Sequence, residues 1–181
     1  RSDYGYEPVG NQCQTYGLSF WIPYHGAGNM ASSEAYYGDG PTEVDPYAFW
    51  SCCYPSNNFA FDMRAKENDY AALRALFRQR RAVVDNFYGD FYPLTAHSTA
   101  KDTWIAWQFD RPEAGEGFVQ VFRRPDSIYK AADIKLRGLD ASARYSVGDV
   151  DQEGKRETVS GRQLMEQGVS TSIPERPGAA V

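Results

Sequence analysis

Aromatic side chains are concentrated in the first half of this 181-residue chain. Of its 27 phenylalanine, tyrosine and tryptophan residues, 20 lie in residues 1–92 and only 7 follow. A change in composition of this size indicates two regions that pack differently. The segment Gly89–Thr95 between them contains a glycine and a proline, which commonly interrupt regular structure. We therefore expect one domain at residues 1–92 and a second at residues 93–181.

Composition excludes two classes of partner. The net charge of −5 argues against a nucleic acid, because affinity for its phosphates depends on clustered lysine and arginine. The mean hydropathy is −0.59, and no apolar stretch approaches the length of a membrane-spanning helix. We expect neither a nucleic acid nor a membrane as a partner.

Two apolar runs and one amphipathic segment organise the first region. The runs Tyr16–Pro23 and Tyr47–Tyr54 are nearly continuous, which is typical of strands covered on both faces, as in a parallel sheet. Residues 66–88 have the helical spacing of apolar positions, with Asn68 or Asp69 as the cap. We interpret the arginines of that segment as a solvated helix face.

The second region reads as a series of short strands separated by glycine-containing turns. This pattern indicates an antiparallel sandwich, and the whole chain is then of the α+β class. The expected strands are Trp104–Phe109, Gly117–Phe122, Ala132–Leu136, Arg144–Val147, Glu157–Ser160 and Val169–Ile173.

Cysteine and histidine give no sign of a metal or cofactor. The three cysteines are Cys13, Cys52 and Cys53, an odd number with no Cys-x-x-Cys pair. The two histidines lie far apart in sequence, and no glycine-rich phosphate loop is present. We expect no cofactor and no metal, and we interpret the adjacent cysteines as small buried apolar residues.

The first region also mixes aromatic faces with directional hydrogen-bonding groups. Sugars present an apolar C–H face and a rim of hydroxyls, so this mixture suits a carbohydrate site. The alternative is that the aromatic residues fill a core, and composition alone favours that alternative. The candidate substrate-binding residues are Gln12, Trp21, Tyr24, His25 and Trp50.

Glycoside hydrolysis needs two carboxylates that flank the scissile bond. Spacing in the sequence does not select a pair, and most of these side chains are expected to be surface charges or helix caps. The available residues are Asp3, Glu7, Asp39, Asp45, Asp62, Asp69 and Asp90.

The order of several segments resembles the C-terminal portion of bacterial alpha-galactosidases of the melibiase-like glycoside hydrolase family. The segments cover nearly the whole chain. They are Arg1–Tyr4, Gln12–Gly17, Ser19–Pro23, Gly89–Thr95, Trp104–Phe109, Gly115–Gly117, Phe122–Arg124, Leu136–Leu139 and Ser160–Met165.

The resemblance implies a fold and a chemistry. It implies that the first domain is the remnant of the last strands and helix of a (β/α)₈ barrel, followed by a C-terminal β-sandwich. It also implies a retaining mechanism on alpha-galactosides, with Asp3 as the acid/base because Ser2-Asp3 matches the family's Ser-Asp step. The nucleophile would lie upstream of Arg1, so the chain is expected to be catalytically incomplete.

Three readings therefore stay open. The chain is a fragment of an alpha-galactosidase, a non-catalytic carbohydrate-binding or domain-packing module, or a small glycosidase that pairs Asp3 with Asp45 or Asp62, completed by oligomerisation. The absence of an initiator methionine suggests a processed or truncated start. We expect the partners to be a galactoside or another carbohydrate, together with further copies of the chain or the missing N-terminal part of the enzyme.

Overall fold

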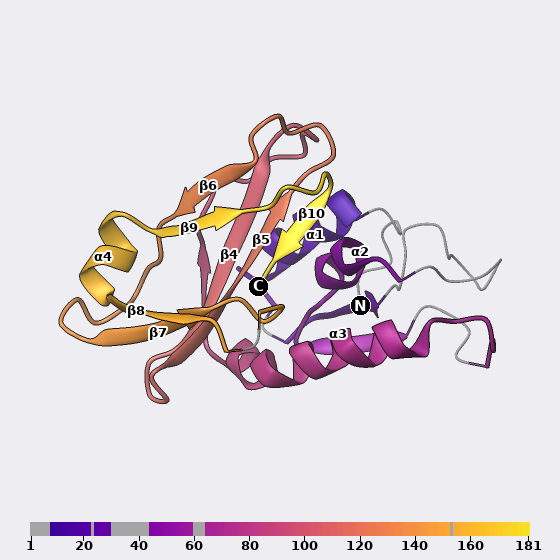
Figure 1. The fold of residues 1–181 in the computed structure, drawn as a ribbon, viewed down its shortest axis with the longest axis horizontal. Helices are drawn as coiled ribbons and strands as arrows, with labels where there is room; N and C mark the ends of the chain where they lie inside the picture. Colours follow the sequence, from indigo (N-terminus) through magenta and orange to yellow (C-terminus); the bar gives the residue numbers. More distant parts are fainter. Residues whose placement is uncertain (1–7, 23, 30–43, 60–63, 153) are drawn as a thin grey trace. The chain divides into compact units, whose positions relative to one another are not determined.

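The computed structural model describes residues 8–22, 24–29, 44–59, 64–152 and 154–181. The chain divides into two compact units (Figure 1). Unit 1 comprises Arg1–Tyr88 with His97–Thr99, and unit 2 comprises Gly89–Ala96 with Ala100–Val181. No helix among the described residues has the length and apolar character needed to cross a membrane.

Helices and short strands alternate in unit 1. The elements are α1 (Pro8–Leu18), β1 (Gly26–Asn29), α2 (Pro46–Ser51), β2 (Ser56–Phe59), α3 (Tyr70–Val83) and the 3₁₀ helix η1 (Val84–Tyr88). Strands β1 and β2 are parallel, with Gly26 opposite Ser56 and Asn29 opposite Phe59. Because α2 lies between them in the chain, the three elements form a parallel strand–helix–strand unit.

Neither of the two apolar runs predicted as strands forms a strand among the described residues. The run Tyr16–Pro23 begins in the last turn of α1 and continues into a turn, and most of the run Tyr47–Tyr54 lies in α2. A continuous apolar run is compatible with a buried helix as well as with a buried strand. At α2 the local signal decides, because Asp45 Oδ1 accepts a hydrogen bond from the Tyr47 backbone at 2.9 Å and Pro46 occupies the first turn.

The predicted amphipathic helix is present but starts later than expected. Asp69 is its cap, and Oδ1 accepts hydrogen bonds from the backbone N–H groups of Ala71 and Ala72 at 3.1 and 3.0 Å. The buried face carries Leu73 and Leu76. The chain then tightens into η1, which ends just before Gly89.

One arginine of α3 does not belong to a solvated face. Arg80 Nη2 donates to the carbonyl oxygens of Tyr54 and Pro55 at 3.0 and 3.2 Å, and its guanidinium lies 5.9 Å from the centre of the Phe87 ring. Arg80 therefore ties α3 to the segment just before β2. The other three arginines of the helix, Arg74, Arg78 and Arg81, are exposed as expected.

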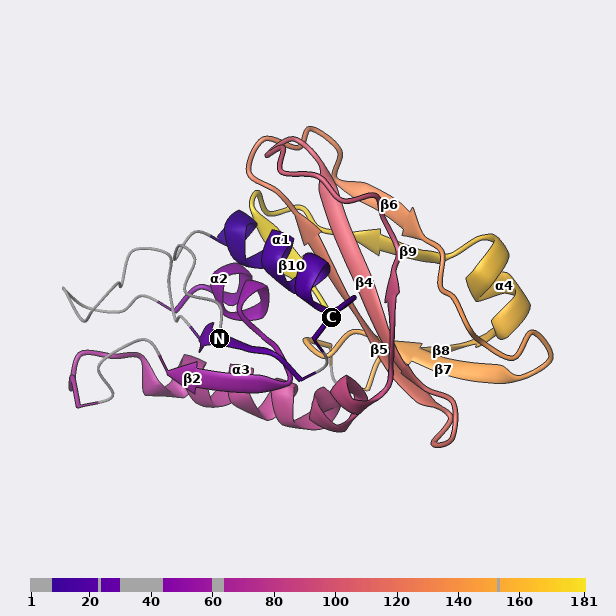
Figure 2. The ribbon, with the colours of Figure 1, turned by 180° about the vertical axis from the view of Figure 1, so that it is seen from behind.

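Unit 2 is built from antiparallel strands, and Figure 2 shows it from behind. Its central sheet has the order β10–β5–β4–β3, and two further pairs are β6–β9 and β7–β8. All six predicted strands are present; β3, β10 and α4 were not predicted. The bounds are β3 Asp90–Pro93, β4 Trp104–Arg111, β5 Glu116–Arg123, β6 Ala131–Ile134, β7 Arg144–Gly148, β8 Arg156–Ser160, α4 Gly161–Glu166, β9 Val169–Ser172 and β10 Gly178–Ala180.

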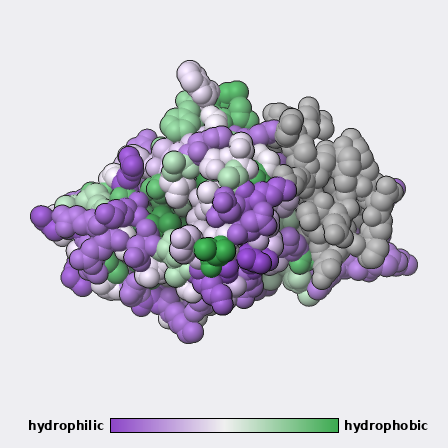
Figure 3. Space-filling model, turned by 90° about the horizontal axis from the view of Figure 1, so that it is seen from above, coloured by the Kyte–Doolittle hydropathy of each residue, from purple (hydrophilic) through white to green (hydrophobic). Residues whose placement is uncertain are grey.

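The central sheet and the β6–β9 pair share a hydrophobic core. Ala106 of β4 and Val121 of β5 pack with Ile134 of β6 and with Ile173, which follows β9. Layers that share one core in this way are the packing of a sandwich. Hydrophilic side chains cover much of the molecular face drawn in Figure 3, as expected for layers whose apolar residues point inward.

A buried arginine joins the loops of unit 2. Arg123 is 3% exposed, and its Nη1 donates to the carbonyl oxygens of Ile173 and Pro174 at 3.0 and 2.8 Å. Its Nη2 donates to the carbonyl of Ser127 at 2.9 Å. These charge-assisted hydrogen bonds compensate for the burial of the cation, so the Phe122–Arg124 segment of the resemblance has a structural role here.

Candidate functional site

Unit 1 contains a group of buried polar side chains, which we call the inner polar cluster: Asn11, Gln12, Thr15, Ser51 and Tyr54. Gln12 Nε2 donates to Ser51 Oγ at 2.8 Å, which joins α1 to α2. The hydroxyls of Tyr54 and Thr15 both donate to the carbonyl of Asn11, at 2.7 and 3.0 Å. Burial raises the pKa of Tyr54 far above its usual value, so its hydroxyl stays a donor.

His25 lies beside this cluster, immediately before β1. Its ring meets the Tyr54 ring edge-on at 5.0 Å, and its Nε2 is 3.1 Å from Ser19 Oγ. Burial lowers the pKa of His25 to about 4, so the imidazole is neutral at physiological pH. Nδ1 is buried and has no hydrogen-bond partner among the described residues.

Two of the predicted substrate-binding residues are core residues instead. Gln12 is fully buried, and Trp50 is 2% exposed, with its ring edge-on to Phe49 at 5.6 Å. Neither side chain can reach a ligand in this structure. Residue type could not separate the two cases, because an aromatic core with polar cross-links has the same composition as a sugar site.

Trp21 and Tyr24 are exposed, with 85% and 55% of their surface accessible. Both lie in the connection from α1 to β1, and the Tyr24 ring is 5.4 Å from that of Tyr88. This connection and His25 lead into the amino end of β1. Ligands of parallel α/β folds bind at the opposite end, beyond the carboxyl ends of the strands. Trp21, Tyr24 and His25 therefore precede the amino end of β1 and do not lie beyond the carboxyl end of a strand.

The carboxyl ends of the two parallel strands are Asn29 and Phe59. Residues 30–43 and 60–63 follow them directly in the sequence, and these segments lie outside the described residues. Four of the candidate carboxylates also lie outside them: Asp3, Glu7, Asp39 and Asp62.

The remaining candidate carboxylates have structural positions. Asp45 caps α2, and Asp69 caps α3. Asp90 is exposed on β3, opposite Asp110 of β4. Within the described part of the chain, no group of three or more histidine, cysteine, aspartate or glutamate side chains could hold a metal ion.

The sequence model of the glycosyl hydrolase family 36 C-terminal domain matches residues 104–176, which include most of unit 2. No curated protein sequence matches the chain.

Solved alpha-galactosidases share the fold. The galactosidase domain of the alpha-galactosidase–sucrose kinase AgaSK matches with a TM-score of 0.67 and 17% identity, covering 96% of this chain and 24% of that chain. A variant of the family 36 alpha-galactosidase AgaA from Geobacillus stearothermophilus, solved with raffinose, matches with a TM-score of 0.65 and 19% identity. This match covers 97% of this chain and 23% of that chain. AgaB from the same organism matches with a TM-score of 0.56 and 22% identity, covering 97% of this chain and 23% of that chain.

The sequence match is to the C-terminal domain of glycosyl hydrolase family 36, and it covers residues 104–176 of this chain. The structural matches extend over 96–97% of the chain and show that it shares its fold with part of these alpha-galactosidases. The resemblance to alpha-galactosidases drawn from the sequence segments is thus confirmed. The chain spans about a quarter of the length of the solved enzymes that it resembles.

Proposed function

We propose that this chain is the C-terminal part of a family 36 alpha-galactosidase, with unit 1 as the end of a (β/α)₈ barrel and unit 2 as the C-terminal β-sandwich. The observation that carries this is the parallel pair β1–β2, joined through α2 and flanked by α1 and α3. Two parallel strands do not close a barrel, which needs eight. The chain spans 24% of the length of the galactosidase domain of AgaSK, which agrees with this arrangement.

The chemistry then follows the retaining mechanism. Asp3 would protonate the leaving oxygen of an alpha-galactoside and later activate the water that hydrolyses the covalent intermediate. The second carboxylate, about 5 Å away in retaining enzymes, would come from the preceding part of the barrel. Asp45 is the cap of α2, so it does not serve as that partner. The chain alone is therefore catalytically incomplete.

The inner polar cluster has a defined part in this proposal. The bond from Gln12 to Ser51 and the bond from Tyr54 to Asn11 fix α1 against α2 and the segment that leads into β2. Rigid elements hold catalytic loops more accurately than flexible ones do. The cluster therefore supports the position of the strand ends from a distance and touches no substrate.

A second candidate function is a non-catalytic carbohydrate-binding module. The exposed rings of Trp21 and Tyr24 favour it, because sugar C–H faces stack on accessible aromatic surfaces. The third reading, a small glycosidase completed by oligomerisation, keeps only the pairing of Asp3 with Asp62, since Asp45 is a cap.

The experiment combines titration calorimetry with a chromogenic alpha-galactoside assay. If the chain is a fragment, calorimetry should detect no heat of galactose binding, and the assay should detect no turnover. Asp3→Ala should then change neither result. Galactose binding that is lost in Trp21→Ala would favour the module. Turnover that is lost in Asp3→Ala but kept in Asp45→Ala would favour the self-sufficient enzyme.

A further inference from the structure

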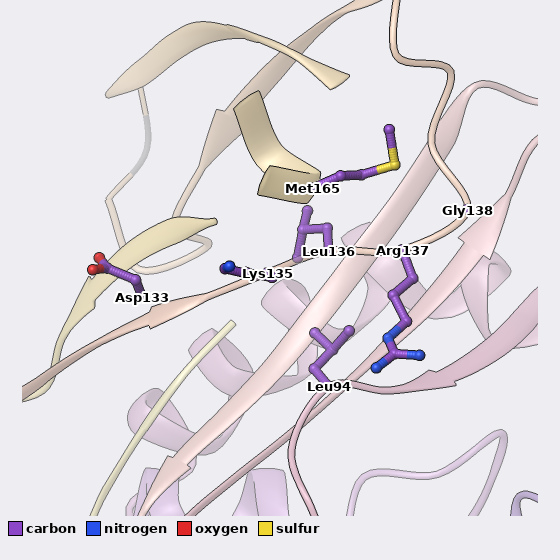
Figure 4. Close-up of a pocket in the computed structure, with 7 residues that line it drawn as sticks. All are labelled: Leu94, Asp133, Lys135, Leu136, Arg137, Gly138 and Met165. Carbon is purple, nitrogen blue, oxygen red and sulfur yellow. The ribbon is translucent and has the colours of Figure 1, made fainter. Parts of the chain in front are cut away.

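Unit 2 contains a hollow of about 600 Å³ between β6, the end of β3 and α4 (Figure 4). Two segments of the resemblance, Leu136–Leu139 and Ser160–Met165, meet at this hollow, although the catalytic proposal gives neither of them a role. The lining residues are Leu94, Asp133, Lys135, Leu136, Arg137, Gly138 and Met165.

Hydrogen bonds from the central sheet fix the wall of this hollow. Gln108 of β4 donates from Nε2 to the carbonyl of Arg137 and accepts at Oε1 from the backbone N–H of Arg137, both at 2.9 Å. The backbone N–H of Leu136 donates to the carbonyl of Leu164 in α4 at 3.0 Å. Buried Gln108 thus holds the backbone of Arg137 as a neighbouring strand would, and the hollow is formed before any ligand arrives.

The same wall has no room for a side chain at Gly138. Its φ is +73°, and a Cβ atom there would lie 2.6 Å from the hydroxyl of Tyr92. The turn at Gly138 is therefore closed against Tyr92 of β3, and the neighbouring Arg137 is an exposed residue of the lining.

The chemistry of the lining is amphipathic. The Leu94 side chain points toward Leu136, the Leu136 side chain points toward Met165, and the Arg137 side chain extends alongside Leu94 (Figure 4). The Arg137 guanidinium makes no hydrogen bond or ion pair with any residue that the structure describes.

Two further charges complete the lining. Lys135 adds a second cation, and its ammonium also makes no hydrogen bond or ion pair with the described residues. Asp133 lies farther along the wall. An apolar floor with an uncommitted guanidinium at its edge suits a ligand with an apolar body and one anionic group.

We propose that this hollow binds a small organic anion with an aliphatic body. The body packs on Leu94, Leu136 and Met165, and the anionic group accepts two parallel hydrogen bonds from Arg137. Asp133 disfavours a second negative charge at the far end of the ligand. The proposal does not depend on the catalytic proposal, because all of the lining residues lie in unit 2.

Methionine methyl signals give a direct test, with hexanoate as the probe. The chain has three methionines, Met30, Met63 and Met165, and only Met165 lines the hollow. In NMR spectra of the methyl-labelled chain, hexanoate is expected to shift the Met165 signal saturably and to leave the other two in place. Met165→Leu identifies the signal. A shift that does not saturate, or that is equal for all three methyl groups, would overturn the proposal.

Variants and related probes test the two halves of the ligand. Arg137→Gln is expected to weaken hexanoate binding at least tenfold, and Arg137→Lys to weaken it less, because one ammonium cannot make the bidentate contact. Arg162→Gln removes the same charge from α4 outside the lining, and binding should be unchanged. Inorganic phosphate and 1-hexanol should each bind at least tenfold more weakly than hexanoate. Equal binding of either probe, or equal effects of the Arg137→Gln and Arg162→Gln variants, would refute the proposal.

Discussion

His25 occupies a buried position that favours its neutral form. Burial lowers the pKa of its imidazole to about 4, whereas the ordinary value is 6.5. Above pH 6.5 the ring is neutral in both the folded and the unfolded chain, so it does not affect stability. Between pH 6.5 and 4 only the unfolded chain gains the proton, so the free energy of unfolding falls as the pH drops. A shift of this size corresponds to about 3 kcal/mol.

Replacement of His25 should therefore flatten the acid side of the stability profile. Between pH 6.5 and 4 the free energy of unfolding should fall in both proteins. We expect the fall to be about 3 kcal/mol smaller for His25→Gln than for the parent chain. Urea unfolding at a series of pH values measures the difference. His97→Gln, which replaces the exposed second histidine, is the control. Equal slopes for the parent and His25→Gln would contradict the prediction.

Asp110 shows the opposite dependence on pH. Burial raises the pKa of its carboxyl group, and Asp90 on the neighbouring strand adds like charge. The folded chain therefore opposes ionisation, and stability is lost as the pH rises from the ordinary pKa of 3.8 through the raised one.

Asp110→Asn should therefore raise the free energy of unfolding at pH 7, and the gain should disappear near pH 3. Urea unfolding at the two pH values gives the comparison. Asp90→Asn removes only the neighbouring charge from an exposed position, so its gain at pH 7 should be smaller. A loss of stability in Asp110→Asn at pH 7 would show that the carboxylate is needed in its charged form.

Local sequence signals predict the elements of unit 2 better than those of unit 1. The glycine-rich turns and short apolar segments of unit 2 place β4 to β9 within a few residues of the expected bounds. In unit 1 burial comes from all sides, so the run Tyr47–Tyr54 has no periodicity that separates a helix from a strand. Strands β1 and β2 consist of Gly-Ala-Gly-Asn and Ser-Asn-Asn-Phe. Such segments have no hydrophobic pattern, and only tertiary pairing makes them strands.

The cap of α2 can be tested by removing its carboxylate. Asp45→Ala should cost about 1 kcal/mol of unfolding free energy, because the backbone N–H of Tyr47 loses its acceptor. Asp69→Ala at the start of α3 should cost a similar amount. Asp102→Ala replaces an exposed aspartate that caps no helix, and should change the value little. Chemical denaturation measures the free energy of unfolding of all three variants. An unchanged free energy of unfolding in Asp45→Ala would show that Asp45 does not stabilise α2 as a cap.

The glycine in the wall of the hollow gives a matched pair of substitutions. Gly138→Ala combines a positive φ of +73° with a contact against the Tyr92 hydroxyl, so we expect a cost of about 2 kcal/mol or more. Gly115→Ala, at a φ of +66° with open space around it, should cost about 1 kcal/mol from backbone strain alone. Thermal unfolding measures the difference. Tyr92→Phe should relieve part of the extra cost, and equal costs at the two glycines would show that the contact with Tyr92 is unimportant.

At the scale of the whole molecule, unit 1 exposes several large apolar side chains. Phe20, Trp21, Ile22, Tyr24 and Tyr88 are each more than half accessible. Contiguous apolar surface of more than a few hundred Å² commonly marks a surface that another molecule or domain covers. The proposed barrel end would present such a surface when the rest of the barrel is absent.

We therefore expect the isolated chain to associate with itself. Light scattering should give an average mass above 20.4 kDa that rises with concentration, and the double variant Trp21→Ser with Ile22→Ser should reduce it. Ile128→Ser is the control, because it removes an exposed apolar residue from unit 2 instead. A monomer at every concentration would contradict the expectation.

The candidate sites were less predictable from sequence than the fold. Gln12 and Trp50 were chosen by residue type, and burial, which decides whether such a residue meets a ligand, depends on contacts between distant segments. Arg137 was missed as a binding residue because Leu94, Arg137 and Met165 come together only in the folded unit. The one available signal was the pair of resemblance segments that contain Arg137 and Met165.

Turnover of a chromogenic alpha-galactoside by the isolated chain, measured across a range of chain concentrations, tests the central claim most directly. The account predicts no turnover above background at any concentration, because the reaction needs a carboxylate from the preceding part of the barrel. Turnover of about 1 s⁻¹ or faster per chain, an ordinary enzymatic rate, would contradict it. A rate that rises with the square of the concentration would assign the activity to an oligomer.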